Sequence, residues 1–359
     1  MTANLYDAHR QWAQRLPDER FESLEDLLDH AKSRKDMSRE AERSIASLHV
    51  STNDQGAVGL NGRSATALLT NWSFGQLCRS VSAPTRYLRS LPPDIVQSCL
   101  NHGLLTADGK CKILYRANGK PNGSDAAGVV AAITGPTYGR IWDAEVVEVL
   151  LDAISDSGWH LPVGAGNRPS GLYASDRDFF AFFVDDEDPV EVAGSKLGRG
   201  FFCWNSETGA ASFGLTTFLY NHVCRNHVVW GAEDVREIRI EHRDQASEHF
   251  RSRALPALTR FVASHKVAEN VRPVVEAAAN FHVGTDLSKV LTWFENRPFT
   301  KSEIEQAWET GQKEGEDVTT LWGMVQGLTA NARTLLFTNR RVHLERRAGA
   351  LLKVAASAH

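Results

Sequence analysis

The spacing of hydrophobic residues divides this chain into helical ends and a strand-rich middle. The apolar positions near the start recur at helical spacing; they are Phe21, Leu24, Leu27 and Leu28. Ser23 and Asp26 form a capping pair at the beginning of this pattern. We therefore expect residues 1–47 to form a charged helical arm.

The section from residue 48 to residue 244 consists of short apolar runs separated by Gly, Pro and Asn, which is typical of strands and turns. Strands are predicted at Lys112–Ala117, Val129–Thr134, 171–185, 190–194, 198–207 and Val235–His242. Helices are predicted at Ala65–Val81, from Pro93 until just before Gly103, and from a cap at Asp143 to Gly158.

Two polar segments in this section are interpreted as turns. The acidic run Asp185–Asp188 precedes Pro189 and lacks the glycine framework of a calcium-binding loop, so it predicts a solvated turn. Asn205, Ser206 and Glu207 precede Gly209, and this composition is typical of a hairpin turn. A catalytic role for Glu207 remains the alternative.

After residue 245 the pattern is again helical, with a capping box at Thr300–Glu303. Strands in the middle and helices at both ends predict an α+β fold. We expect a helical N-terminal arm (1–47), a core domain (48–244) with a central antiparallel β-sheet and packed helices, and a helical C-terminal region (245–359).

The composition is that of a soluble globular protein. Of the 359 residues, 42% are hydrophobic and 23% are charged, and the net charge of −4 excludes a chain that coats nucleic acid uniformly. The five cysteines are scattered and form no CxxC pair, which predicts reduced thiols. Because no segment resembles a signal peptide or a membrane span, we expect a cytoplasmic protein without membrane contact.

The most informative stretch runs from residue 198 to residue 231, where three Asn, two Cys and two His lie in an aromatic and β-branched sequence. Polar groups in an apolar run are costly unless they are hydrogen-bonded or used. His222, Cys224 and His227 are acceptable zinc ligands, but a fourth ligand is not evident. We therefore predict neither a metal nor a cofactor, and we find no catalytic signature in the chain.

Arginine is the charge feature that points to a ligand, because its planar fork binds phosphate through two hydrogen bonds. Exposed aromatic rings beside arginines could stack on bases. The residues that we predict to contact nucleic acid are Arg225, Arg239, Arg243, Arg340, Arg341, Arg346, Arg347, Tyr138 and Trp204.

An ordered series of segments resembles the phage/plasmid-like protein family of unknown function. The segments are SAPTRYLRSLPPDIVQSCLNHGL, AITGPTYGRIWDAEVVEVLLDAI, GLYASDRDFFAFFVD, GRGFFCWNSETGAASFG and LYNHVCRNHVVWG. The resemblance implies that the gene belongs to a mobile element, and it implies no reaction. A strand leading into a helix and then into meandering strands is also similar, at the level of the fold, to phage single-strand annealing proteins.

These observations favour a non-enzymatic nucleic-acid-binding protein of a phage or plasmid. We expect it to bind or anneal single-stranded DNA and to work as a homo-oligomer. One alternative is a mobile-element enzyme that uses residues 205–227. Another is a protein–protein interaction factor that uses the charged N-terminal arm.

Overall fold

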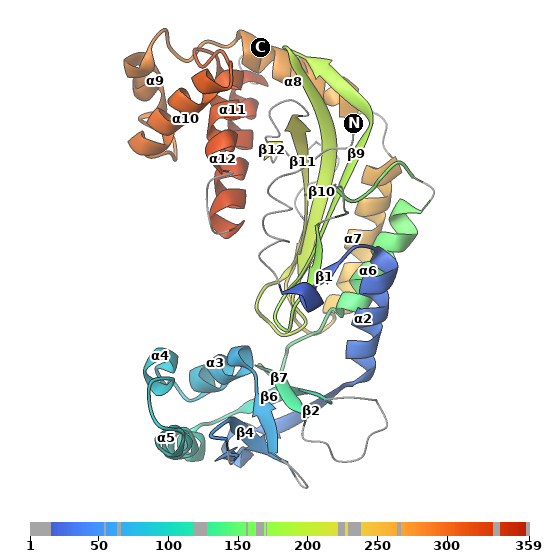
Figure 1. The fold of residues 1–359 in the computed structure, drawn as a ribbon, viewed down its shortest axis with the longest axis vertical. Helices are drawn as coiled ribbons and strands as arrows, with labels where there is room; N and C mark the ends of the chain where they lie inside the picture. The colour runs from blue at the N-terminus through green and yellow to red at the C-terminus, as the bar shows by residue number, and fades with distance from the viewer. Residues whose placement is uncertain are drawn as a thin grey trace.

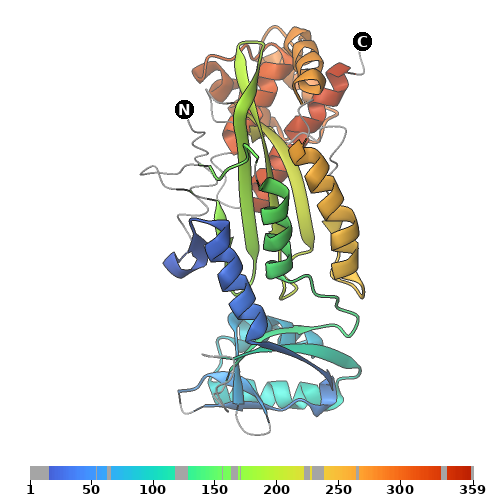
Figure 2. The same cartoon turned by 90° about the vertical axis from the view of Figure 1, so that its right-hand side faces the viewer.

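The computed structural model describes residues 16–356, except 54, 63–65, 118–127, 156, 163–168, 170, 222–226, 229–237, 264–266 and 333–337. Its architecture is α+β, as the sequence predicts, but the strands form two sheets instead of one (Figure 1). A smaller unit built on the six-stranded sheet, then the seven-stranded sheet, then the C-terminal helices follow one another along the long axis of the molecule (Figures 1 and 2). No helix within the described residues is long and apolar enough to span a membrane.

The N-terminal arm is only partly helical. Helix α2 (Leu24–Asp36) begins where the sequence predicts, and the Ser23 side chain accepts a hydrogen bond from the Asp26 backbone N–H. The arm continues as a strand, β2 (Ser38–Ser44), which pairs with β6 (Lys110–Arg116) along its whole length. Its charged composition favours a helix, and the backbone hydrogen bonds to β6 override that preference. Short elements flank these two: η1 (Pro17–Glu19), β1 (Arg20–Phe21) and η2 (Ile45–Ser47).

The smaller unit is a six-stranded sheet, which we call sheet B, with helices packed on one face. Its strand order is β2-β6-β7-β5-β4-β3, and only the β5–β7 pair is parallel. The remaining strands are β3 (Val50–Thr52), β4 (Val58–Asn61), β5 (Thr66–Leu69), β6 (Lys110–Arg116) and β7 (Val129–Thr134). The helices are α3 (Asn71–Ser80), α4 (Thr85–Leu88) and α5 (Pro93–Thr106).

Two predicted helices of this unit have different bounds in the structure. The helix expected from Ala65 begins only at Asn71, because the β-branched and leucine-rich residues before it form β5. Helix α5 continues beyond Gly103, where a Cβ atom would lie 2.9 Å from the Val81 Cβ. Gly103 therefore permits close packing inside the helix and does not end it.

The second sheet, sheet A, has the order β1-β8-β9-β10-β11-β12, and β13 also pairs with β11. Its strands are β8 (Leu172–Ala174), β9 (Phe179–Val192), β10 (Ser195–Asn205), β11 (Phe213–Asn221), β12 (His227–Val228) and β13 (Ile238–Ile240). The predicted acidic turn at 185–188 is wrong, because these residues belong to β9, whose register with β10 shifts at this point. The chain reverses at Ala193 and Gly194 instead, both of which have positive φ, as a tight hairpin requires.

The two faces of sheet A differ. One face packs on α2, α6 (Asp143–Ile154) and α7 (Ala246–Ala263) through a large apolar cluster that includes Phe183, Phe201 and Phe250. The opposite face carries six aromatic rings; they are Tyr173, Phe180, Phe182, Phe202, Trp204 and Phe218. Cross-strand glycines make room for two of these rings, since a Cβ at Gly214 would lie 2.0 Å from the Trp204 ring.

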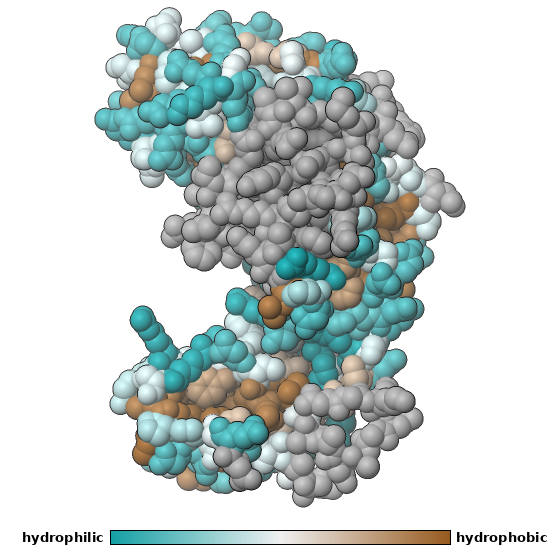
Figure 3. Space-filling view, in the orientation of Figure 1, coloured by the Kyte–Doolittle hydropathy of each residue, from teal (hydrophilic) through white to brown (hydrophobic). Residues whose placement is uncertain are grey.

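The C-terminal region is helical, as predicted, and packs on the far end of the β9–β10 hairpin. Its helices are α8 (Val267–Asn280), α9 (Leu287–Phe294), α10 (Lys301–Lys313), α11 (Leu321–Ala332) and α12 (Thr338–Ala356). The predicted capping box at Thr300–Glu303 is confirmed. The space-filling view shows a broad hollow on one side of the molecule, between this region and the smaller unit (Figure 3). Helices α3 and α4 form its lower rim (Figure 1).

Candidate functional site

The turn between β10 and β11 is the place where sheet A meets sheet B. The sequence predicts a turn there, and the structure confirms it, with Gly209 in a positive-φ conformation. Its side chains are nevertheless buried. The residues Asn205, Ser206, Glu207 and Thr208 are between 0% and 3% exposed. Turn geometry alone does not require burial, so these polar groups depend on partners from other elements.

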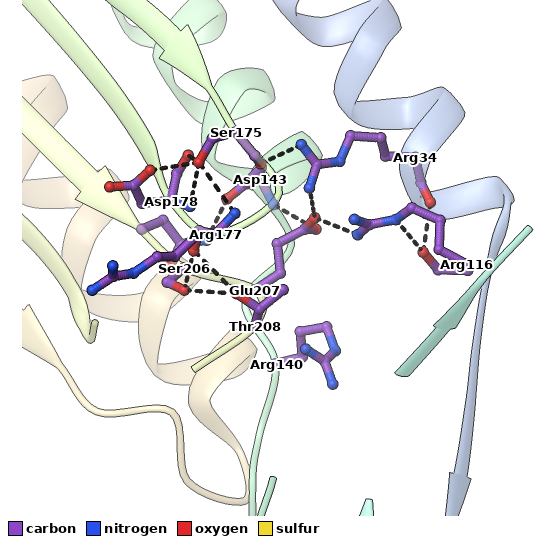
Figure 4. Close-up of polar contacts among 12 residues, drawn as sticks. Arg34, Arg116, Arg140, Asp143, Ser175, Arg177, Asp178, Ser206, Glu207 and Thr208 are labelled. Carbon is purple, nitrogen blue, oxygen red and sulfur yellow. Dashed lines mark hydrogen bonds and ion pairs between the residues drawn. The ribbon is translucent and has the colours of Figure 1, made fainter. Parts of the chain in front are cut away.

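Glu207 is held by arginines from two elements (Figure 4). Its Oε1 accepts a hydrogen bond from Arg116 Nη2 on β6 at 3.0 Å, and Arg34 Nη2 on α2 lies 3.9 Å from the same oxygen. Arg34 also donates to the Ser175 carbonyl, which ties α2 to the turn between β8 and β9. We call Arg34, Arg116, Asp143, Asn205 and Glu207 the joint cluster.

Asp143 occupies the second acidic position of the joint cluster. It is the first residue of α6 and not its cap, because Trp142 is the N-cap residue and provides no side-chain bond. The Asp143 carboxylate instead accepts from Asn205 Nδ2 at 2.7 Å, and its backbone N–H donates to Glu207 Oε2 at 3.4 Å. Asn205 Nδ2 also donates to the Ile141 carbonyl.

Burial dominates the acid–base properties of this cluster. It raises the pKa of Asp143, and the nearby Glu207 carboxylate raises that pKa further. Burial also lowers the pKa of the Arg116 guanidinium to about 10, with the charge of Arg34 as the next cause. Because its acids and arginines are enclosed together, the cluster is a buried polar network that joins α2, β6 and α6 to the β10–β11 turn.

The same turn fixes a second group of residues at its surface. The Thr208 carbonyl accepts from Trp72 Nε1 at 2.9 Å and from Gln76 Nε2 at 2.8 Å, both on α3. The hydroxyls of Ser206 and Thr208 donate to the Arg177 carbonyl at 2.6 and 3.0 Å. Helix α3 and the β8–β9 turn are thereby attached to the same three-residue segment.

Trp72 carries two arginines from different elements. The Arg79 guanidinium carbon lies 5.3 Å from the centroid of the indole, and that of Arg177 lies 4.6 Å from it. Both arginines are exposed, and Trp72 is half-buried. We call Trp72, Arg79 and Arg177 the tryptophan–arginine stack. Figure 4 shows the Arg177 side chain extending away from the Glu207 carboxylate.

A third arginine, Arg89, lies at the end of α4 and contacts α3 next to the stack. Arg89 lies 5.6 Å above the Phe74 ring, and its Nη2 donates to the Asn71 carbonyl at 2.7 Å. Tyr87, which lies in α4 two positions before Arg89, is 61% exposed. The ion pairs found among the described residues involve none of Arg79, Arg89 and Arg177. Arg177 has acidic neighbours in sequence, but the Asp178 carboxylate accepts from the Ser175 hydroxyl.

Our sequence analysis missed this surface, although the sequence contains a signal for it. From Gln55 to Pro93 the chain has no Asp or Glu, and it has four arginines. A long acid-free segment with arginines and exposed aromatic residues predicts a local positive patch in a chain whose net charge is negative. Nothing in the sequence indicates that Arg177 contacts Trp72, because the two residues are 105 positions apart.

The structure places two of the predicted residues together. Trp204, Gly214 and Arg239 lie in one row across β10, β11 and β13, and Arg239 Nε donates to the Ser212 hydroxyl at 2.8 Å. Tyr138 lies near the β10–β11 turn, where its hydroxyl donates to the Ser206 carbonyl. Its ring stacks on that of His242, with 5.1 Å between the centroids. Burial is the main cause of the raised pKa of Tyr138.

The other predicted arginines do not join them in one patch. Arg243 is exposed and pairs with Glu241 at 3.0 Å. On α12, Arg346 is exposed, whereas Arg347 pairs with Glu303 at 2.5 Å, donates to the Pro298 carbonyl and lies above the Phe299 ring. Arg340 and Arg341 belong to α12, but their side chains lie outside the described residues.

Arg225, a predicted nucleic-acid contact, lies outside the described part of the chain. His222 and Cys224 of the alternative hypothesis also lie outside it, and of His227 only the backbone, in β12, is described. Among the residues that the structure does describe, no three His, Cys, Asp or Glu side chains are placed to hold a metal ion.

Residues 131–335 match the family described as a domain of unknown function, DUF932. The match begins in β7, includes nearly all of sheet A and ends beyond α11. This chain belongs to the DUF932 family. Neither the curated proteins nor the solved structures contain a match to it. In this DUF932 protein, Arg177 and the joint turn fall inside the matched region, whereas α3 with Trp72 and Arg79 precedes it.

Proposed function

We propose that this DUF932 protein is a nucleic-acid-binding protein of a phage or plasmid, and that it binds single-stranded DNA as a homo-oligomer. The observation that carries the proposal is the tryptophan–arginine stack, in which Arg79 and Arg177 are exposed on one indole ring within 5.3 Å of its centroid. Arginines that stack on an aromatic ring keep their hydrogen-bonding edges available for phosphate.

Charge neutralisation supplies the affinity in this proposal. Arg79, Arg89 and Arg177 neutralise phosphates and release counterions, so the affinity falls as salt rises. Exposed Tyr87 and half-buried Trp204 offer ring faces on which unpaired bases can stack. Stacking of this kind needs bases that are not enclosed in a duplex, and it therefore favours a single strand.

The location of the stack supports the same function. Trp72 and Arg79 belong to α3, and this helix forms the lower rim of the hollow between the smaller unit and the C-terminal helices (Figures 1 and 3). The surrounding segment, residues 55–93, contributes arginines and no acidic residue. A local positive surface attracts a polyanion even when the whole chain is slightly acidic.

Fluorescence anisotropy of a labelled single-stranded oligonucleotide and of its duplex, in a salt titration, tests the proposal. We expect tighter binding of the single strand, with a slope of log affinity against log salt that falls by about 0.7 for each phosphate contact removed in Arg79→Ala and Arg177→Ala. Arg243→Ala is the matched control, because that exposed arginine already pairs with Glu241.

Three results would contradict the proposal. They are the absence of binding at low salt, an affinity independent of salt, and equal losses in the two stack variants and the Arg243→Ala control. Light scattering of the purified protein, alone and with oligonucleotide, tests the homo-oligomer, and a monomer in both samples would overturn that part.

A further inference from the structure

We propose that Arg79 and Arg177 act as one clamp on neighbouring phosphates of a single strand, and that Gln76 is the positioning residue that sets the separation of the two guanidinium groups. This inference rests on the proposed function. It goes further because it assigns the grip on the strand to two units of the fold and to a residue that does not touch the ligand.

The two arginines come from different units. Arg79 lies on α3 of the smaller unit, and Arg177 lies in the turn between β8 and β9 of sheet A. Their guanidinium groups nevertheless share the Trp72 ring. Two cations at one ring repel each other, and an anion between them removes that repulsion. A phosphodiester strand supplies such anions at regular intervals along its backbone.

Gln76 connects the smaller unit to the β10–β11 turn, with one hydrogen bond at each end of its amide. Its Nε2 donates to the Thr208 carbonyl at 2.8 Å, and its Oε1 accepts from the Ile133 backbone N–H at 2.8 Å. The side chain is 6% exposed, so these two bonds have no competition from bulk water. Helix α3, strand β7 and the β10–β11 turn are thereby fixed at one point.

Arg177 is connected to the same point from the other side. Its carbonyl accepts from the Thr208 hydroxyl at 3.0 Å and from the Ser206 hydroxyl at 2.6 Å. The segment Ser206–Thr208 therefore holds the backbone of one arginine through hydroxyls, and the helix of the other through a carbonyl. A change at Gln76 alters the distance between the arginines without removing either of them.

The variant Gln76→Met tests this inference, because it keeps the length of the side chain and removes both hydrogen bonds. Gln97→Met is the matched control. Gln97 connects α5 to β3 in the same unit, where its Oε1 accepts from the Thr52 backbone N–H at 3.1 Å and from the Thr52 hydroxyl at 3.2 Å. Both variants lose amide contacts of the smaller unit, but only Gln76 reaches the joint.

We expect Gln76→Met to bind the single-stranded oligonucleotide about tenfold more weakly than wild type, with a salt slope smaller by about 0.7, as for the loss of one phosphate contact. Gln97→Met is expected to bind as wild type does. The measurements are made at a temperature at which circular dichroism shows both variants folded. Equal affinities and equal slopes for the two variants would overturn the clamp.

A milder variant keeps the inference testable if Gln76→Met does not fold. Thr208→Val conserves the shape of the side chain and removes the hydroxyl bond to the Arg177 carbonyl. It is expected to lower the salt slope in the same direction, and an unchanged slope would contradict the clamp. If the wild-type protein binds no oligonucleotide, the proposed function itself fails. If the wild type binds and the variants match it, only the clamp fails.

Discussion

Arg116 Nη2 and Glu207 Oε1 lie 3.0 Å apart in the structure, although their residues are 91 positions apart in the sequence. The side chains are 10% and 3% exposed, so both charges have lost most of their water. A buried ion pair of this kind contributes mainly through the cost of breaking it, since removing one partner leaves an uncompensated charge.

Replacing Glu207 by Gln tests how much the joint cluster depends on that charge. The variant leaves Arg116 and Arg34 without their carboxylate, and we expect it to lower the free energy of unfolding by about 3–5 kcal/mol. Urea denaturation measures the change. The control is Glu42→Gln, whose partner Lys110 is largely exposed, and it should leave stability unchanged. Equal effects of the two variants would contradict this account of the joint.

His242 makes the stability depend on pH. Burial lowers the pKa of this imidazole to about 4, so the folded protein keeps it neutral where the unfolded chain protonates it. Its contribution, about 3 kcal/mol, is complete above pH 6.5 and is lost as the pH falls towards 4.

The expected readout is the stability difference between wild type and His242→Gln, measured by urea denaturation from pH 4.5 to pH 8. That difference should shrink as the pH decreases below 6.5. Asp143 acts in the opposite direction, because its pKa is raised and its contribution is lost as the pH rises. The comparison with the variant removes this common term. A difference that is constant with pH would show that His242 does not titrate as burial requires.

Gly214 is required because the Trp204 ring lies against it. A Cβ at this position would be 2.0 Å from Trp204 Cζ2, so the ring or the strand has to move. We expect Gly214→Ala to destabilise the protein by about 1–3 kcal/mol, as in other overpacked sites. Thermal unfolding of Gly135→Ala provides the comparison, since a Cβ at Gly135 meets nothing within 4 Å. Similar losses in the two variants would argue against the steric explanation.

Arg347 has a structural role on α12. It pairs with Glu303 at 2.5 Å and lies 4.9 Å from the centroid of the Phe299 ring, which connects α12 to the start of α10. Arg347→Ala should therefore lower the stability by about 1–2 kcal/mol and leave oligonucleotide affinity at the wild-type value. Anisotropy and urea denaturation on the same preparation separate the two effects. A loss of affinity without a loss of stability would contradict this structural role and would indicate that Arg347 contacts nucleic acid.

Local patterns predicted several elements with their correct bounds or caps. Strand β7 spans Val129–Thr134 as expected, and the capping box at Thr300–Glu303 is present. These features depend on residues within a few positions of one another, for which side-chain period and capping chemistry are sufficient. The turn predicted at 185–188 was wrong, because the structure of this segment depends on residues far from it in the sequence. The run lies within β9, where Asp185 and Val190 pair with β10 on either side of a shift in register, and Asp185 forms an ion pair with Arg199 at 2.5 Å.

The candidate site was partly predictable. The sequence indicated that the polar residues of 205–207 have partners or a use, and it indicated that arginines and aromatic rings form the surface of interest. It could not show that Asn205 bonds to Asp143, because that contact forms when α6 packs on sheet A, or that Arg177 reaches Trp72, because that contact forms when the two units meet. Nor did it show that Arg347 forms an ion pair with Glu303, which is 44 positions away.

By itself the sequence determined the α+β class, the helical C-terminal region and the positions of several strands, among them β6, β7 and β10, because hydrophobic period and turn residues act over short distances. It also contained the acid-free segment 55–93, which is a property of composition. Only the tertiary structure decided that the strands divide into two sheets, that the 205–208 turn is buried between them, and that Arg79 and Arg177 share one ring. Those outcomes depend on contacts between residues far apart in the chain, and such contacts form only when the two units pack against each other.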